Sequence, residues 1–179
     1  EFLLGCNKMD QILTTSEHSK NGFLQCVFDK HDEKTKKKVG ELKLEKPIDV
    51  LFEGVDLTIY NKTTSIAKAV TDELSVIKED FNFLFVGHWL KGETGQDRKD
   101  VGMMIKTFCE TFKNKAKKNR PGLILKTSHA TFSIIDRDII TQRIQAIISP
   151  YGDRAPSIYL LHGDLTDNEM NSLYNHPKV

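Results

Sequence analysis

The chain has 179 residues, of which 39% are hydrophobic and 28% are charged, and its formal net charge at pH 7 is +1. This composition is typical of an ordinary globular protein, and a nearly neutral chain creates no overall field that would attract nucleic acid or an anionic membrane. No apolar run is long enough to span a bilayer. The three cysteines, Cys6, Cys26 and Cys109, form no close pair and are odd in number, which favours a reducing, cytoplasmic compartment.

The beginning of the chain predicts a short strand followed by a helix. Residues 11–15 (QILTT) favour a strand, and Ser16 is a suitable N-cap for the helix that we expect to follow. The expected apolar positions of this helix are Phe23, Leu24, Val27 and Phe28.

A polar run over residues 30–38 follows, and we expect it to be a solvated loop or a frayed helix end. No aromatic residues alternate with its lysines, so a nucleic-acid patch is disfavoured. Residues 47–52 (PIDVLF) predict a second short strand. Residues 62–80 place apolar side chains at helical spacing and predict a partly helical connector between two domains.

After Asp80, strand and helix patterns alternate three times. Continuous apolar runs predict buried strands of the parallel kind, and each is followed by apolar residues at helical spacing. Thr166, with Glu169 three residues later, forms a capping box at the start of the last helix. The strands are expected at 81–86, 123–125 and 158–161, and the longer helices at 100–119 and 136–148.

This alternation predicts an α/β fold with a parallel, Rossmann-like sheet and right-handed crossovers. A sheet of three strands is thin, so we expect an incomplete domain, preceded by the tail of another α/β domain. The expected organisation is a preceding domain over residues 1–62, a connector over 63–80, and a second domain over 81–179.

In open α/β sheets, ligands bind beyond the carboxyl ends of the strands. The loop that follows the strand at 81–86 contains glycine and leads to Arg98 and Lys99, where a helix begins. Glycine permits close approach of the backbone, and helix-start amides with two cations suit a diphosphate. The spacing matches neither standard nucleotide-binding glycine motif. In a structural alternative, the neighbouring Asp97 and Asp100 only neutralise the two cations.

The end of the second strand argues against NAD. A dinucleotide-binding unit uses an acidic residue there to bind the ribose hydroxyls, whereas this chain has Lys126. A phosphate-rich or sugar-bearing nucleotide fits better.

Other residues near the strand ends have ordinary structural interpretations. His88, His129 and His162 each follow a strand but lack the spacing typical of a zinc site, so no metal ligands are predicted. Trp89 is expected either beside the ligand or as a packing cover over the sheet. Cys109 lies within a helix and is expected to be a core thiol rather than a nucleophile.

Four segments together resemble the GT-B glycosyltransferases of the family 4 type, which transfer sugars from nucleotide-sugar donors. The first two resemble the end of the acceptor-side domain and a following strand exit. The other two resemble the opening of the donor domain and a later unit of the same domain. In chain order the segments are 10–20 (DQILTTSEHSK), 51–56 (LFEGVD), 83–87 (FLFVG) leading into 97–100 (DRKD), and 159–165 (YLLHGDL) leading to Leu173 and Tyr174.

The resemblance implies a set of binding residues. Lys99 falls on the lysine that grips the donor diphosphate, whereas His88 stands where the family has an arginine, a departure for which Arg98 could compensate. Gly87 completes this diphosphate site. The residues implied to bind the nucleotide base are Gly163, Asp164 and Leu165.

The family's two glutamates beside a glycine-rich loop have no counterpart before Val179, so no catalytic residue is identified and the chain alone is expected to be an inactive fragment. The resemblance implies a cytoplasmic, metal-independent, retaining glycosyltransferase that needs no cofactor, because the nucleotide-sugar is its substrate. The acceptor is an unknown glycan, lipid or protein; no nucleic-acid partner is expected, and the intact enzyme could associate peripherally with a membrane. Two alternatives stay open: a nucleotide-binding module without catalysis, and a polyanion-binding protein that uses the lysines at 34–38 and 113–118.

Overall fold

The computed structural model describes residues 2–91 and 95–179. The chain forms two compact units, Glu1–Asp56 and Leu57–Val179, which are described separately. The assignment of these units to an acceptor-side domain and a donor domain stays a prediction. No helix within the described residues has the length and hydropathy needed to cross a membrane.

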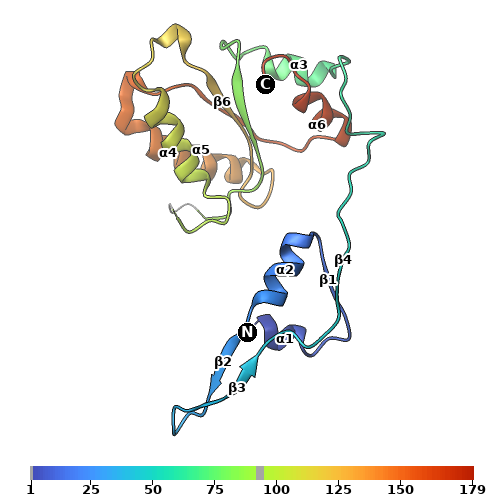
Figure 1. Cartoon of the computed structure of the whole chain (residues 1–179). Coiled ribbons are helices and arrows are strands. Elements are labelled where there is room, and N and C mark those ends of the chain that lie inside the picture. The colour runs from blue at the N-terminus through green and yellow to red at the C-terminus, as the bar shows by residue number, and fades with distance from the viewer. Residues whose placement is uncertain (1, 92–94) are drawn as a thin grey trace. The chain divides into compact units, whose positions relative to one another are not determined.

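The first unit contains two small sheets (Figure 1). β1 (Ile12–Thr14) pairs in parallel with β4 (Ile48–Val50), and the expected strands therefore form. Ser16 caps α2 (Glu17–Gln25) as predicted, because its side chain accepts the backbone N–H of Ser19. A short helix, α1 (Phe2–Cys6), precedes them and buries Leu3.

The end of α2 and the segment that follows differ from the prediction. The helix stops at Gln25, and Phe28 begins a strand, so Val27 and Phe28 are not helical. β2 (Phe28–His31) and β3 (Lys38–Leu42) form an antiparallel hairpin, so only residues 32–37 form the expected solvated loop. Side-chain pairs across the hairpin support it modestly, since the Lys38 ammonium lies 2.6 Å from the carboxylate of Asp29 and 2.9 Å from that of Glu41.

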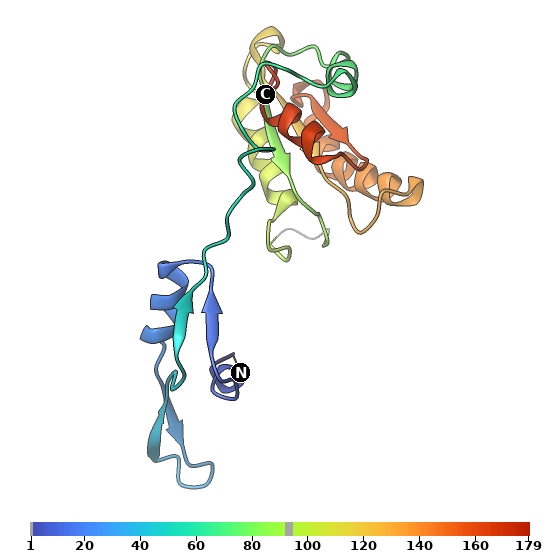
Figure 2. The same cartoon turned by 90° about the vertical axis from the view of Figure 1, so that its right-hand side faces the viewer.

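The second unit is a three-layer α/β structure whose parallel sheet has the order β5-β6-β7. Figures 1 and 2 show α4 and α5 on one face of this sheet and α3 and α6 on the other. The predicted fold class, α/β with parallel strands, is thus confirmed. The strands are β5 (Asn82–Val86), β6 (Gly122–Lys126) and β7 (Ile158–Leu161), and the helices are α3 (Lys68–Leu74), α4 (Val101–Phe112), α5 (Ile134–Ile148) and α6 (Asp167–Tyr174).

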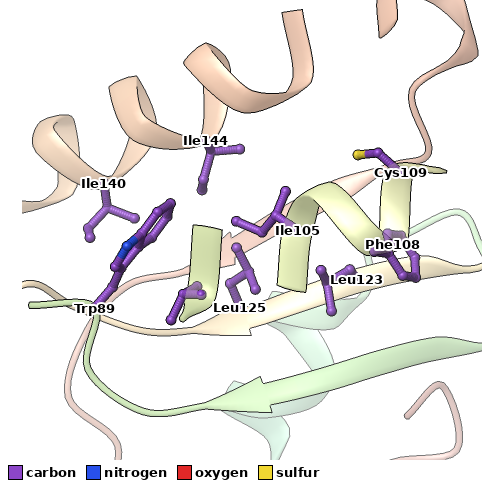
Figure 3. Close-up of a cluster of buried hydrophobic side chains, with 9 residues drawn as sticks. Trp89, Ile105, Phe108, Cys109, Leu123, Leu125, Ile140 and Ile144 are labelled. Atoms are coloured by element: carbon purple, nitrogen blue, oxygen red, sulfur yellow. The ribbon is translucent and has the colours of Figure 1, made fainter. Parts of the chain in front are cut away.

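The central strand β6 is buried along its whole length, and its alternating side chains enter two separate cores. Leu123 and Leu125 point into the core beneath α4 and α5, where they meet Ile105 and Ile140 (Figure 3). Ile124 points to the opposite face. There it packs in the core beneath α3 and α6, with Val70, Leu74, Ile77 and Leu173.

Two predicted helices are shorter than expected. α4 ends at Phe112 and is followed by a separate 3₁₀ turn over Lys117–Asn119, so the lysines at 113–118 do not share a helical face. The Arg120 guanidinium accounts for this early end, because it donates to the carbonyl groups of Lys113 and Lys115 at 3.2 and 2.8 Å. Within the expected connector over 63–80, only α3 is helical, and this helix contributes buried residues to the second unit.

Leu125→Ala tests the packing of the central strand. The Leu125 side chain is fully buried, so its truncation is expected to lower the free energy of unfolding by about 2–5 kcal/mol. Urea denaturation measures this change. Val76→Ala is the control in the same unit, because Val76 is 71% exposed and its truncation should change stability by less than about 0.5 kcal/mol. Equal effects of the two substitutions would contradict the described core.

Candidate functional site

The three strands of the second unit end at one edge of the sheet, and hydrogen bonds continue beyond their ends. The backbone N–H of Gly87 donates to the Lys126 carbonyl at 3.1 Å, and that of Trp89 donates to the Ser128 carbonyl at 2.8 Å. The ammonium of Lys126 donates to the Gly163 carbonyl at 2.5 Å. These contacts hold the loops after β5, β6 and β7 together as one rim.

The Lys99 side chain lies directly over Gly87, where β5 ends. A Cβ atom at Gly87 would collide with the Lys99 amine, and the φ angle of Gly87 is +154°, which side-chain-bearing residues rarely adopt. The Lys99 ammonium also lies 3.5 Å from the Val86 carbonyl and 5.8 Å from the centre of the Phe85 ring. Because Gly87 has no side chain, the exposed Lys99 ammonium can lie at the end of β5, a strand that is mostly half-buried.

The loop before α4 is held by Asp100, which is the N-cap of that helix. Its carboxylate accepts the N–H groups of Gly95 at 3.0 Å and Met103 at 3.4 Å, so Asp100 is more than a neutralising charge. The remaining N–H groups of the first turn have no partner within the helix, as at any helix start. Arg98 is exposed and has no hydrogen bond or ion pair to a residue in the described ranges. Residues 92–94 of the predicted loop lie outside those ranges.

His88 and Trp89 have different environments although they are neighbours. His88 is exposed, and its Nδ1 lies 3.1 Å from the Ser128 hydroxyl on the next loop. Trp89 is 1% exposed and belongs to the core beneath α4 and α5, so the packing interpretation is the one that the structure favours (Figure 3). Its carbonyl accepts bonds from Arg143 at 2.8 Å and from His129 at 3.1 Å.

Lys126 is almost completely buried at the end of the central strand. Burial lowers the pKa of its ammonium, and the negative charge of Asp164 opposes this effect. Its Nζ atom lies 4.9 Å from the centre of the Phe132 ring and is bonded to Gly163. Lys126 therefore positions the loop after β7 through its bond to Gly163, whereas Lys99 and Arg98 are exposed cations.

Asp136, which was predicted only as the start of a helix, connects two elements of the second unit. Its buried carboxylate accepts a 3.0 Å hydrogen bond from His162 Nε2, which joins α5 to the end of β7. Burial alone would raise the pKa of Asp136, but the hydrogen-bond donors around it outweigh that effect and lower the pKa below its ordinary value. The signal in the sequence was Ser133, which caps α5 three residues before Asp136. The donors to the carboxylate are the backbone N–H groups of His129, Ala130 and Thr131 and the ring of His162.

A hollow lies between α3 and the loop after β7, and its volume is about 240 Å³. Its lining includes the three residues assigned to base binding, Gly163, Asp164 and Leu165. The opposite wall consists of α3 residues, which the sequence analysis did not associate with a site. They are Ala69, Val70, Glu73 and Leu74.

The described residues contain no group of three or more His, Cys, Asp or Glu side chains that could hold a metal ion. The three histidines considered for such a group have separate protein partners: His88 pairs with the Ser128 hydroxyl, His129 with the Trp89 carbonyl, and His162 with Asp136. Cys109 is fully buried, and burial raises the pKa of its thiol to about 11, which is the behaviour of a core thiol.

The site thus belongs to an α/β fold with parallel strands whose loops meet at the carboxyl ends. No protein-family model matches the sequence, and the search of curated proteins found no match. The solved structures that are similar in fold include two from one kind of enzyme. They are the trehalose-6-phosphate synthase OtsA, with 16% identity and a TM-score of 0.51, and a trehalose-6-phosphate protein from E. coli bound with UDP-2-fluoro glucose, with 15% identity and a TM-score of 0.50.

Both likenesses cover 94% of this chain but only 38% of the other. At such low identity they show a common fold alone. The family 4 resemblance and the individual binding residues therefore stay predictions.

Asp136→Asn tests the link between α5 and β7. The amide cannot accept all the bonds that the buried carboxylate accepts, so the free energy of unfolding at pH 7 is expected to fall by about 2–4 kcal/mol. The folded-state pKa of Asp136 is lowered, so its contribution is complete above about pH 4 and is lost as the pH falls through the lower folded-state value. Urea denaturation of the variant should accordingly show a smaller loss of stability on acidification. Asp138 lies on the exposed side of the same helix, so Asp138→Asn should have the stability of the wild type. Wild-type stability of Asp136→Asn as well would disprove the link between α5 and β7.

Proposed function

We propose that this chain provides the donor-binding part of a glycosyltransferase that takes its sugar from a nucleotide-sugar. The observation that carries the proposal is the exposed Lys99 ammonium over Gly87, at the carboxyl end of β5 and beside the start of α4. Cations and helix-start amides stabilise the negative charge of a diphosphate. The same groups would stabilise a nucleoside diphosphate as it leaves, which is an electrostatic role that needs no metal.

The residues of the proposed donor site occupy two places on one rim. Gly87, His88, Arg98 and Lys99 would face the diphosphate, while the base would lie against the loop at Gly163, Asp164 and Leu165. Lys126 supports this arrangement, because its bond to Gly163 connects the central strand to the base-binding loop.

The solved structure that holds UDP-2-fluoro glucose supports the choice of a nucleotide-sugar, since its fold matches 94% of this chain. We extend the proposal to a retaining, cytoplasmic enzyme of the GT-B family 4 type with an unidentified glycan, lipid or protein acceptor. The chain spans 38% of that structure, and the acidic residues that the family uses against the sugar are not among its own. We therefore expect the isolated chain to bind the donor nucleotide but to have little or no transferase activity.

A different observation favours polyanion binding as a second candidate function. An open hollow of about 1090 Å³ lies away from the rim, and Lys115, Lys117 and Lys118 are among its lining residues. These lysines would bind phosphate groups without regard to the base, although Glu79 and Asp80 line the same hollow, and such binding would weaken steeply with salt.

Lys99→Ala separates these functions. Isothermal titration of the chain with UDP and with GDP should show saturable binding of at least one of them, and the substitution is expected to weaken it about 10-fold or more, the effect of losing one charge-assisted contact. Lys106→Ala is the matched control, because Lys106 is an exposed lysine on α4 that does not contact Gly87. Its affinity should equal that of the wild type.

The same titration at two salt concentrations tests the alternative. Equal binding of every polyanion, a steep salt dependence, and loss of binding on replacement of both Lys117 and Lys118 by alanine would favour polyanion binding. Full nucleotide affinity in Lys99→Ala would refute the proposed diphosphate site. A longer chain that includes the family's two glutamates tests catalysis. If it bound the nucleotide but transferred no sugar, the result would favour the nucleotide-binding module without catalysis.

A further inference from the structure

The hollow between α3 and the loop after β7 combines apolar walls with two carboxylates, those of Glu73 and Asp164. Its volume of about 240 Å³ is smaller than the pockets of about 300–1,000 Å³ that enclose a whole drug-sized ligand, so it suits a flat ring. Apolar side chains from both sides would cover the faces of such a ring. They are Val70, Leu74, Leu161 and Leu165.

Helical geometry places Glu73 at this hollow. Val70 and Leu74 are buried in the core, and Ala69 and Glu73, four residues apart, share the adjacent stripe of α3. Ala69 has a small side chain, so the longer Glu73 is the α3 residue that brings a polar group to the hollow.

The two carboxylates that line the hollow, those of Glu73 and Asp164, differ in their hydrogen bonds and ion pairs to the protein. Asp164 accepts the N–H of Leu165 at 3.1 Å, and its charge acts on Lys126 below. Glu73 forms no hydrogen bond or ion pair with any residue of the described ranges, although neighbouring Asp72 on the same helix is paired with Lys68 at 2.5 Å. Glu73 is therefore the carboxylate of the hollow whose two oxygens are both without a partner among the described residues.

A carboxylate only accepts hydrogen bonds, and its two oxygens can receive two parallel donors. Guanine has two adjacent donors on one edge, the ring N1–H and the N2 amino group. Uracil has a single N–H between two carbonyl groups, and those oxygens would face the carboxylate unfavourably. Adenine and cytosine each place an acceptor nitrogen beside their amino group, so neither matches both oxygens.

From this match we infer that Glu73 makes the site selective for guanine, so that the donor is a GDP-sugar. The inference rests on the proposed function, because it names the base of the nucleotide whose diphosphate would lie at Lys99. It differs from the solved structure that holds a UDP-sugar analogue, a likeness that at 15% identity concerns the fold alone.

Titration of the 179-residue chain with GDP and UDP, for the wild type and Glu73→Gln, tests the inference. The wild type should bind GDP roughly 10- to 100-fold more tightly than UDP, the discrimination of one bidentate contact to a base edge. In Glu73→Gln the affinity for GDP should fall towards that for UDP, while the affinity for UDP should stay unchanged. Asp72→Asn removes the same charge from the neighbouring position, which does not line the hollow, and should retain the preference for GDP.

The other outcomes show whether the guanine assignment fails alone or together with the proposed donor-binding function. Tighter binding of UDP than of GDP by the wild type would overturn the guanine assignment, and the diphosphate site at Lys99 would stand. An equal loss of both nucleotides in Glu73→Gln would show that Glu73 contacts the ribose, which also overturns the assignment. If neither nucleotide bound to the wild-type chain, the proposed function would fail together with this inference.

Discussion

The two-sided burial of the central strand β6 is the constraint on which the candidate site depends. Its side chains alternate between two cores, so Leu125 holds α4 and α5 on one face and Ile124 holds α3 and α6 on the other. Both helix pairs are thereby fixed against one strand. The buried Lys126 at the end of that strand then joins its own loop to Gly163 on the next. The positions of the loops at the rim therefore depend on the packing of β6 in the two cores.

Most of the second unit was predictable from the sequence because its elements carry strong local signals. Apolar runs identified all three strands, and the capping box at Thr166 correctly placed the start of α6. The predicted end of α4 was wrong because contacts with residues distant in sequence override the local helical pattern. α4 looked longer because its lysines continue a helical pattern, but Arg120 binds the carbonyl groups after Phe112 and also those of Asp153 and Ala155.

The candidate site was predictable to a lesser extent. The order of strand, glycine-containing loop and cation predicted that Lys99 belongs to the site. The direct contact of the Lys99 side chain with Gly87 could be seen only in the fold. The Asp136–His162 pair joins residues 26 positions apart, so no local pattern announced it, although Ser133 marked the helix start. Glu73 lies on a segment that was expected to be a connector, and only the packing of α3 against the sheet brings it close to the loop after β7.

The central claim is that a nucleoside diphosphate binds along the rim at the carboxyl ends of β5 and β7. Backbone amide NMR of the chain during titration with a nucleoside diphosphate tests it most directly. The account predicts that the signals of Gly87, Lys99, Gly163 and Leu165 shift together and saturate at one affinity. Shifts confined to the hollow around Lys117 and Lys118, or no shift at the rim at saturating nucleotide, would contradict it.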